Sequence, residues 1–263
     1  MRSTLISGLK RIDTKAAVDL ITKRLKMLYE ELNASGIILE VRNTINSFIN
    51  IIVAVRCVGR NYCYGIYFEG SEGGSKNIDR LYRLTRFNLL RMDIRHIYRY
   101  IKRNIPEVTL TTKKPVKYIN LENDLKVLFL REYARENNLI LSEDICRSEW
   151  LTGAFDKYYI NNADVLPLTG LYKTQLRVIA RALRIAHLMK NTIENKYWIE
   201  LKKDLGIESL PDEKIDAVLY GITDYRWGIK EITSDLNLDS DIVEKIRLVI
   251  ETSDFIRHTP ITF

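Results

Sequence analysis

The sequence is poor in cysteine, proline and histidine, and it has no long apolar run. Its three cysteines form no CxxC pair, and its three histidines show no metal-ligand spacing. This excludes a disulfide framework and favours buried, reduced thiols. No apolar run reaches the roughly 20 residues that a membrane helix needs. The opening stretch MRSTLISGLKRID also lacks the apolar core of a signal peptide, so we expect a cytoplasmic protein without membrane contact.

Charge is the feature that the chain has in excess. Its 41 lysines and arginines outnumber 34 acidic residues, which gives a net charge of +7 and a pI near 9.2. This favours polyanionic partners such as nucleic acid or phosphate-rich ligands. The apolar share of 46% is ordinary for a globular protein, and 263 residues suffice for one large domain.

The order of predicted elements indicates an α/β fold. Apolar residues at helical spacing predict a helix over 14–34, followed by a buried strand in IILEV, a helix over 46–58 and a strand in YCYGIYFE. EGSEGGSK is a loop. Further predictions are a helix over 120–137, strands in NLILSED and ADVLPL, and helices over 172–190, 194–204, 212–221, 229–236 and 239–252.

Strands that alternate with helices predict a parallel sheet with helices on both faces and a helical C-terminal extension. We expect a single domain over 1–263, with a sheet-containing core at 14–190 and a helical part at 191–263. Ligands bind at the carboxyl ends of strands in such sheets. The turn VRNTINS, which follows the first predicted strand, is therefore a candidate phosphate loop, although it contains no glycine.

One segment resembles a known family. Residues 147–183, RSEWLTGAFDKYYINNADVLPLTGLYKTQLRVIARAL, match in order and spacing the SE, TGxFTKYGDG, AD and LYKTQ motifs of ammonia-dependent NAD synthetases. NLENDLKVLFLREYA resembles the family's NLQARxRMxxLYxxA, and SDFIRHTPITF resembles its tail. The resemblance covers about 14–263 and implies the adenine-nucleotide α-hydrolase-like fold, usually a homodimer. An active form would use ATP, Mg²⁺ and free ammonia or a separate ammonia donor.

The resemblance also implies roles for particular residues. Glu149 would be a metal ligand, Asp164 and Lys157 would contact the deamido-NAD substrate, and Ser47, Lys173 and Arg257 would contact ATP. Apart from the resemblance, Glu149 is also typical of a helix cap, Asp164 of a strand edge or a turn, and Lys173 of a solvated helix start.

Several positions depart from the family's pattern. Its SGGxDS loop falls on 42–47, where Asn43 and Thr44 replace glycines and are expected to carry side chains into the phosphate space. Asn46 replaces an aspartate that would help to hold Mg²⁺. Residues 143–146 replace GTxN, and Asp124 and Ile256 replace basic residues. Loss of one oxyanion donor costs about 10²–10³ in rate, so these changes together predict loss of catalysis.

Residues 77–104 are rich in arginine and aromatic residues. The predicted helix would align several arginines along one side, which suits phosphate contact and base stacking. The candidate nucleic-acid residues are Arg80, Arg83, Arg91, Arg95, Arg99 and Arg103. A solvated amphipathic helix that covers the sheet gives the same pattern.

The sequence therefore favours a degenerate NAD synthetase homologue that needs no cofactor and acts as a binding or structural subunit, associated with RNA or a ribonucleoprotein. The alternative is an ammonia-dependent NAD synthetase with a remodelled phosphate loop. A nucleotide sensor that binds without turnover is a third hypothesis.

Overall fold

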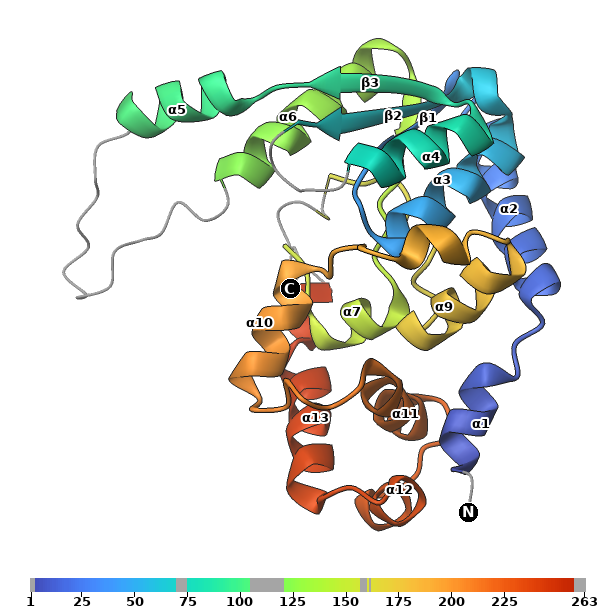
Figure 1. The fold of residues 1–263 in the computed structure, drawn as a ribbon, viewed down its shortest axis with the longest axis vertical. Coiled ribbons are helices and arrows are strands. Elements are labelled where there is room, and N and C mark those ends of the chain that lie inside the picture. The colour runs from blue at the N-terminus through green and yellow to red at the C-terminus, as the bar shows by residue number, and fades with distance from the viewer. Residues whose placement is uncertain (1–2, 70–74, 105–120, 157–159, 161, 258–263) are drawn as a thin grey trace.

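The computed structural model describes residues 3–69, 75–104, 121–156, 160 and 162–257. Within these ranges lies a parallel sheet of four strands in the order β3-β2-β1-β4 (Figure 1). The strands are β1 (Gly36–Glu40), β2 (Cys63–Phe68), β3 (Asn88–Met92) and β4 (Leu139–Leu141). Ile37 of the central strand β1 pairs with Cys63 on one side and with Ile140 on the other.

Helices pack on both faces of this sheet and form a second layer away from it (Figure 1). They are α1 (Thr4–Lys10), α2 (Thr14–Glu31), α3 (Ile45–Val58), α4 (Ser75–Thr85), α5 (Arg95–Asn104), α6 (Leu121–Glu136), α7 (Arg147–Thr152), α9 (Lys173–Ala182), α10 (Lys196–Asp204), α11 (Asp212–Thr223), α12 (Ile229–Leu236), α13 (Ser240–Thr252) and α14 (Asp254–Arg257), with 3₁₀ turns η1 (Arg60–Tyr62) and η2 (Ala186–Met189).

Strand β1 is buried along its whole length, as a central parallel strand must be. Gly36 begins it because a Cβ there would lie 2.5 Å from the carbonyl oxygen of Tyr62. The chain then turns into α3, which starts where the Thr44 side chain accepts a hydrogen bond from the Ser47 amide. The helix ends at Val58 and is capped by Gly59, whose φ of 81° is a conformation that glycine adopts at little cost.

Three hydrophobic clusters hold the layers together. Leu39 packs with α2 and α3 on one face of the sheet, and Ile38 packs with α6 on the other. The third cluster joins the C-terminal helices, and Leu5 and Leu9 of the N-terminal α1 belong to it. The predicted parallel α/β fold with a helical C-terminal part is therefore confirmed, and the second helical layer also contains the start of the chain.

Three predicted elements differ from the structure. The arginine-rich segment is not one helix, because α4 ends before the buried Phe87 and the chain enters edge strand β3 before α5 begins. ADVLPL contributes one isolated bridge, between Ser142 and Val165. The helix predicted over 172–190 ends at Ala182, after which Arg184 has a positive φ of 60°.

None of the helices in the described ranges is long and apolar enough to cross a membrane.

Candidate functional site

A cavity of about 490 Å³ opens beside the carboxyl end of β1, where the fold class predicts a ligand. Its size lies in the range of small-molecule sites. Six carboxylates line it, from Glu40, Glu122, Asp144, Glu149, Asp156 and Glu194. Five cationic side chains face them, from Arg42, Lys126, Lys173, Arg177 and Lys196. The lining is thus nearly balanced in charge, with six carboxylates against five cations.

The glycine-free loop does not fill this cavity. Asn43 is 1% exposed and does not line it; its amide donates to the carbonyl of Asn191 at 2.8 Å and its side-chain oxygen accepts from Asn77 at 3.0 Å. Thr44 lines the cavity, but its hydroxyl folds back to cap α3. The expectation that both side chains enter the phosphate space is therefore wrong for Asn43, because α4 and the segment after η2 offer polar partners on the other side.

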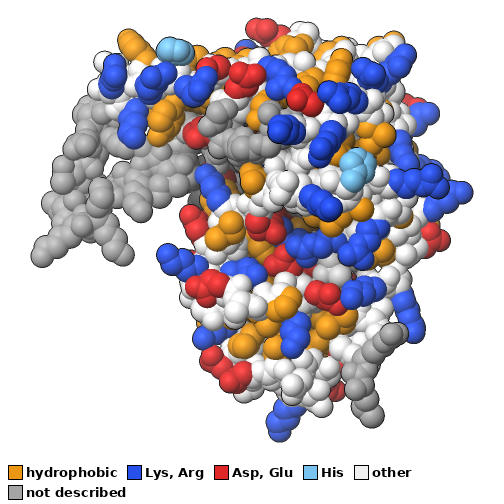
Figure 2. Space-filling view, viewed as in Figure 1, with side chains coloured by type: hydrophobic (Ala, Val, Ile, Leu, Met, Phe, Trp, Pro, Cys, Tyr) orange, Lys and Arg blue, Asp and Glu red, His pale blue; other side chains and the backbone are white. Residues whose placement is uncertain are grey.

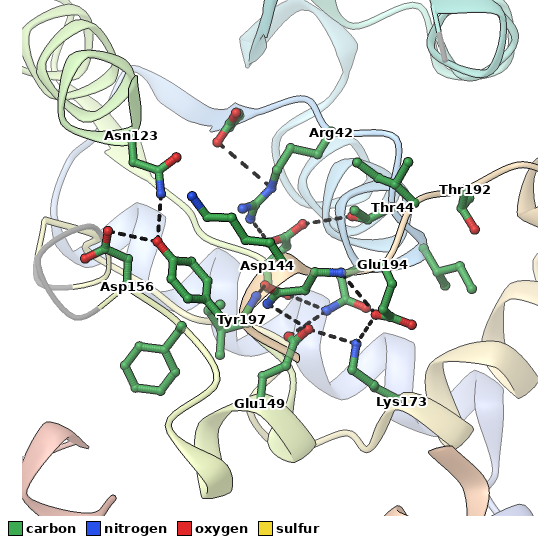
Figure 3. A pocket seen from close by; sticks show the side chains of 18 of the residues that line it. Arg42, Thr44, Asn123, Asp144, Glu149, Asp156, Lys173, Thr192, Glu194 and Tyr197 are labelled. Atoms are coloured by element: carbon green, nitrogen blue, oxygen red, sulfur yellow. Dashed lines mark hydrogen bonds and ion pairs between the residues drawn. The ribbon is translucent and has the colours of Figure 1, made fainter. Parts of the chain in front are cut away.

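Arg42 is a charged residue of the loop that projects into the cavity (Figure 3). Its guanidinium is ion-paired with Asp144, lies 3.3 Å from Glu143 and 3.9 Å from Glu40. Lys126 lies 3.2 Å from the other oxygen of Glu40. Burial raises the pKa of Asp144, Arg42 opposes that rise, and the nearby Glu149 and Glu40 add to it. The protonation of Asp144 therefore depends on the charges of Arg42, Glu149 and Glu40.

Glu149 and Lys173 form a buried ion pair at the centre of the site, with 2.8 Å between the carboxylate and the ammonium (Figure 3). Lys173 also lies 2.6 Å from Glu194, and Asn46 donates to Glu149 at 2.9 Å. Burial acts to raise the pKa of Glu149, but Lys173 and hydrogen bonds from the Cys146 amide and Asn195 together outweigh burial and lower it. Burial acts to lower the pKa of Lys173, but Glu149, Cys146 and Glu194 together outweigh burial and raise it.

This arrangement bears on the alternatives that the sequence left open at both positions. Glu149 accepts from the amide of Cys146 at 3.1 Å and so caps α7 while it lines the cavity. Lys173 is not a solvated residue, because its side chain is 5% exposed. Both residues therefore line the cavity, and their proposed contacts with metal and ATP stay predictions.

The far end of the cavity combines polar and apolar groups. Tyr197 donates to Asp156 at 3.1 Å and accepts from Asn123 at 3.0 Å (Figure 3). Phe155, which stacks on Trp150 at 5.5 Å between ring centroids, contributes an apolar wall. This end of the cavity can therefore accommodate a ligand that has a planar ring with a hydrogen-bonding edge.

The other predicted site residues lie elsewhere. Ser47 is buried beneath the loop and accepts from the Arg42 amide at 3.0 Å. Asp164 accepts from the Leu141 amide at 2.8 Å. Arg257 donates to the carbonyl of Leu151 at 2.7 Å, and none of these three lines the cavity. Lys157 lies outside the described residues. Their ligand-binding roles stay predictions.

The candidate nucleic-acid arginines are divided among three elements. Arg80 and Arg83 are on α4, Arg91 is on β3, and the rest are on α5. Arg91 is paired with Asp79 at 2.6 Å and Arg95 with Asp93 at 2.5 Å. On the face that Figure 2 shows, lysines and arginines are interspersed with acidic and apolar side chains. They do not form one continuous stripe there.

Sequence reasoning missed part of the cavity. Lys126 occupies the position of the second arginine in the NLQARxRM motif, so the resemblance could have identified it. Glu194, Asn195 and Tyr197 belong to a segment in which no family motif was found, and no local signal marks them. All three cysteines are buried free thiols, as predicted. Burial raises the pKa of Cys57 to about 11, which makes it a poor nucleophile at neutral pH.

The carboxylates fit a magnesium ion that arrives with phosphates. Within the described ranges, no group of three His, Cys, Asp or Glu side chains could hold a metal by itself. Mg²⁺ in phosphate-transfer sites uses one or two carboxylates together with phosphate oxygens and water. Asp144 and Glu149 both line the cavity and supply that number.

An open parallel sheet with a charged cavity at its carboxyl edge places this chain among the open α/β proteins, which bind ligands at that edge. Comparison with known proteins narrows this class. The NAD synthase family model matches residues 17–260, and the chain belongs to that family.

Relatives and solved structures agree with this assignment. The NH₃-dependent NAD⁺ synthetase of Saccharolobus solfataricus is 24% identical, over 96% of this chain and 90% of the relative. That of Aeropyrum pernix is 28% identical, over 95% and 88%. The NH₃-dependent NAD synthetase structure from Campylobacter jejuni has a TM-score of 0.75 at 15% identity and covers 96% of this chain and all of its own. The NMN synthetase structure from Francisella tularensis has a TM-score of 0.73 at 16% identity, with 96% and 99% covered.

Proposed function

We propose that this chain is an ATP-dependent ligase that amidates a carboxylate with free ammonia, and that deamido-NAD is its substrate. This replaces the loss of catalysis that the sequence favours. The observation that carries the proposal is the direction of Asn43: the substituted loop leaves the cavity open beside the start of α3. The similarity to NH₃-dependent NAD⁺ synthetases along nearly the whole chain supports the same function.

The proposed reaction has two steps. The substrate carboxylate attacks the α-phosphorus of ATP and pyrophosphate leaves; ammonia then attacks the acyl carbon of the adenylate, AMP leaves, and a proton is released. Such chemistry depends on orientation and on neutralisation of charge that develops on phosphate oxygens. Arg42, Lys126 and Lys173 provide positive charge in the cavity. Asp144 and Glu149 would hold Mg²⁺, which neutralises phosphate charge when it is bound.

The test is formation of NAD from deamido-NAD, ATP, Mg²⁺ and ammonium by the purified chain. Glu149→Gln removes the cavity carboxylate with little change in shape, and we expect it to lower the rate at least about 100-fold. Glu251→Gln, on the exposed face of α13, is the matched control and should leave the rate unchanged. Absence of turnover in the folded wild-type chain, whatever the ammonium concentration, would overturn the proposal.

A second candidate is a non-catalytic subunit that associates with RNA or a ribonucleoprotein. The observation that favours it is a shallow hollow on α5, lined by His96, Ile97, Arg99, Tyr100 and Arg103. Tyr100 is 70% exposed, and an exposed aromatic ring between arginines suits base stacking beside phosphates.

This candidate predicts salt-sensitive binding of single-stranded RNA, measured by fluorescence anisotropy. Arg99→Gln and Arg103→Gln together should weaken it, whereas Arg24→Gln on α2 should not. Wild-type anisotropy that stays flat at low salt would exclude it. Light scattering in the same preparation tests the homodimer that the family resemblance implies.

A further inference from the structure

Arg42 follows β1 directly and reaches the cavity from the loop that replaces the family's glycine-rich turn. Its side chain is 22% exposed, whereas those of Glu40, Glu143 and Asp144 around it are at most 7% exposed. The carboxylates are thus deeply buried, and the guanidinium between them and the open cavity is the accessible partner. A ligand that enters the cavity therefore meets the cation of this cluster first.

The backbone of the loop is partly used by its own side chains. The Arg42 amide donates to the Ser47 hydroxyl at 3.0 Å, and the Ser47 amide donates to the Thr44 hydroxyl at 3.1 Å. A glycine-rich phosphate loop binds its anion with such amides. Because both of these amides donate within the loop, a side-chain donor must provide the hydrogen bonds that they do not provide to the anion. A planar guanidinium suits a phosphate because it donates two parallel hydrogen bonds.

We propose that Arg42 is the residue that contacts the phosphates of the nucleotide in this cavity, and that Asp144 is its partner when no phosphate is bound. This inference rests on the proposed use of ATP. Arg42 exchanges the Asp144 carboxylate for a phosphate group, so the guanidinium is ion-paired both before and after binding. The exchange also releases the Asp144 carboxylate, which lines the same cavity.

This proposal makes Asp144 a competitor of the anion, which gives the two residues opposite effects. The probe is inorganic pyrophosphate, titrated calorimetrically in EDTA so that no metal contributes. We expect Arg42→Gln to weaken binding about tenfold or more, as loss of a charge-assisted contact does. We expect Asp144→Asn to strengthen it roughly threefold to tenfold, because the guanidinium loses one of its internal partners, while Glu143 and Glu40 still compete with the anion.

A double-variant cycle distinguishes direct competition between Asp144 and pyrophosphate from a general change in the electrostatic field of the cavity. Asp156→Asn removes one cavity carboxylate that is hydrogen-bonded to Tyr197, and it measures the gain that any lost negative charge produces. If Arg42 makes the contact, the additional gain of Asp144→Asn must disappear in the Arg42→Gln background. Circular dichroism confirms folding, and Arg42→Lys, which keeps the charge, should retain part of the affinity.

Three results would overturn the assignment: Arg42→Gln binding pyrophosphate as tightly as the wild type, a gain from Asp144→Asn that persists without Arg42, or no binding by either the wild type or Asp144→Asn. The cycle needs no turnover, so its outcome is distinct from that of the amidation assay. Pyrophosphate binding through Arg42 without NAD formation would remove the proposed amidation and leave Arg42 as a phosphate contact of this cavity. NAD formation together with a failed double-variant cycle would leave the proposed amidation standing and remove the role of Arg42.

Discussion

Asn46→Asp restores the carboxylate that the family resemblance expects, and the structure predicts that it destabilises the chain in a pH-dependent way. Asn46 is 8% exposed, and its amide donates to Glu149 at 2.9 Å and to the carbonyl of Asp144 at 3.1 Å. An aspartate loses both donated hydrogen bonds. It also places a second carboxylate against the buried Glu149.

The magnitude follows from the geometry. Two unit charges at the 2.9 Å of the present contact repel by about 6 kcal/mol at an effective dielectric constant of 20. Protonation limits this cost, because raising a carboxyl pKa from about 4 to 7 requires about 4 kcal/mol. We therefore expect Asn46→Asp to lose about 4 kcal/mol of unfolding free energy at pH 7, and Asn46→Ala, which only removes the donors, to lose about 2 kcal/mol.

The order of stability of the two variants should reverse between pH 7 and pH 5. At pH 5 the shared proton costs only about 1.4 kcal/mol, and the protonated carboxyl of the introduced aspartate can again donate to Glu149. The aspartate variant should then be at least as stable as the alanine variant. Urea unfolding followed by circular dichroism at both pH values, in EDTA, measures this. Equal stabilities of the two variants at pH 7, or the same order at both pH values, would refute the proposed contact between position 46 and Glu149.

Three further predictions concern stability. Lys173→Met should cost about 3–5 kcal/mol because it leaves Glu149 buried without its cation; adding Glu149→Gln should recover part of the loss, and urea unfolding of the double variant checks this. Burial would raise the pKa of Asp212, but donated hydrogen bonds outweigh burial and lower it to about 2. The contribution of Asp212 to the free energy of unfolding is therefore present above about pH 4 and lost as the pH falls toward 2. In Asp212→Asn, the free energy of unfolding should fall by about 2 kcal/mol less than in the wild type over this pH range, which acid unfolding measures. Gly36→Ala should lower the melting temperature, because the new Cβ would lie 2.5 Å from a backbone oxygen, whereas Gly170→Ala, with no atom within 4 Å, should change it little.

Local pattern determined much of the fold. The apolar run at β1, the helical spacing of α2 and α6, and the motifs over 147–183 suffice to predict a parallel sheet, the family and a ligand site after β1. These features depend on periodicity and on short-range order, which the sequence carries directly. The edge strand β3 was missed because Arg91 interrupts its apolar pattern: the strand is half exposed, and Arg91 projects to pair with Asp79 on α4.

Only the tertiary structure decided how the site is built. The sequence placed Asn43 in a phosphate loop, but partners at Asn77 and Asn191 turn its side chain away from the cavity. In the fold, Glu149 caps α7 and pairs with the buried Lys173. Arg42 pairs with carboxylates that lie about a hundred positions away in the sequence. Such contacts depend on which elements pack together and on where each side chain then finds a hydrogen-bonding partner. That information arises only when the whole chain is folded.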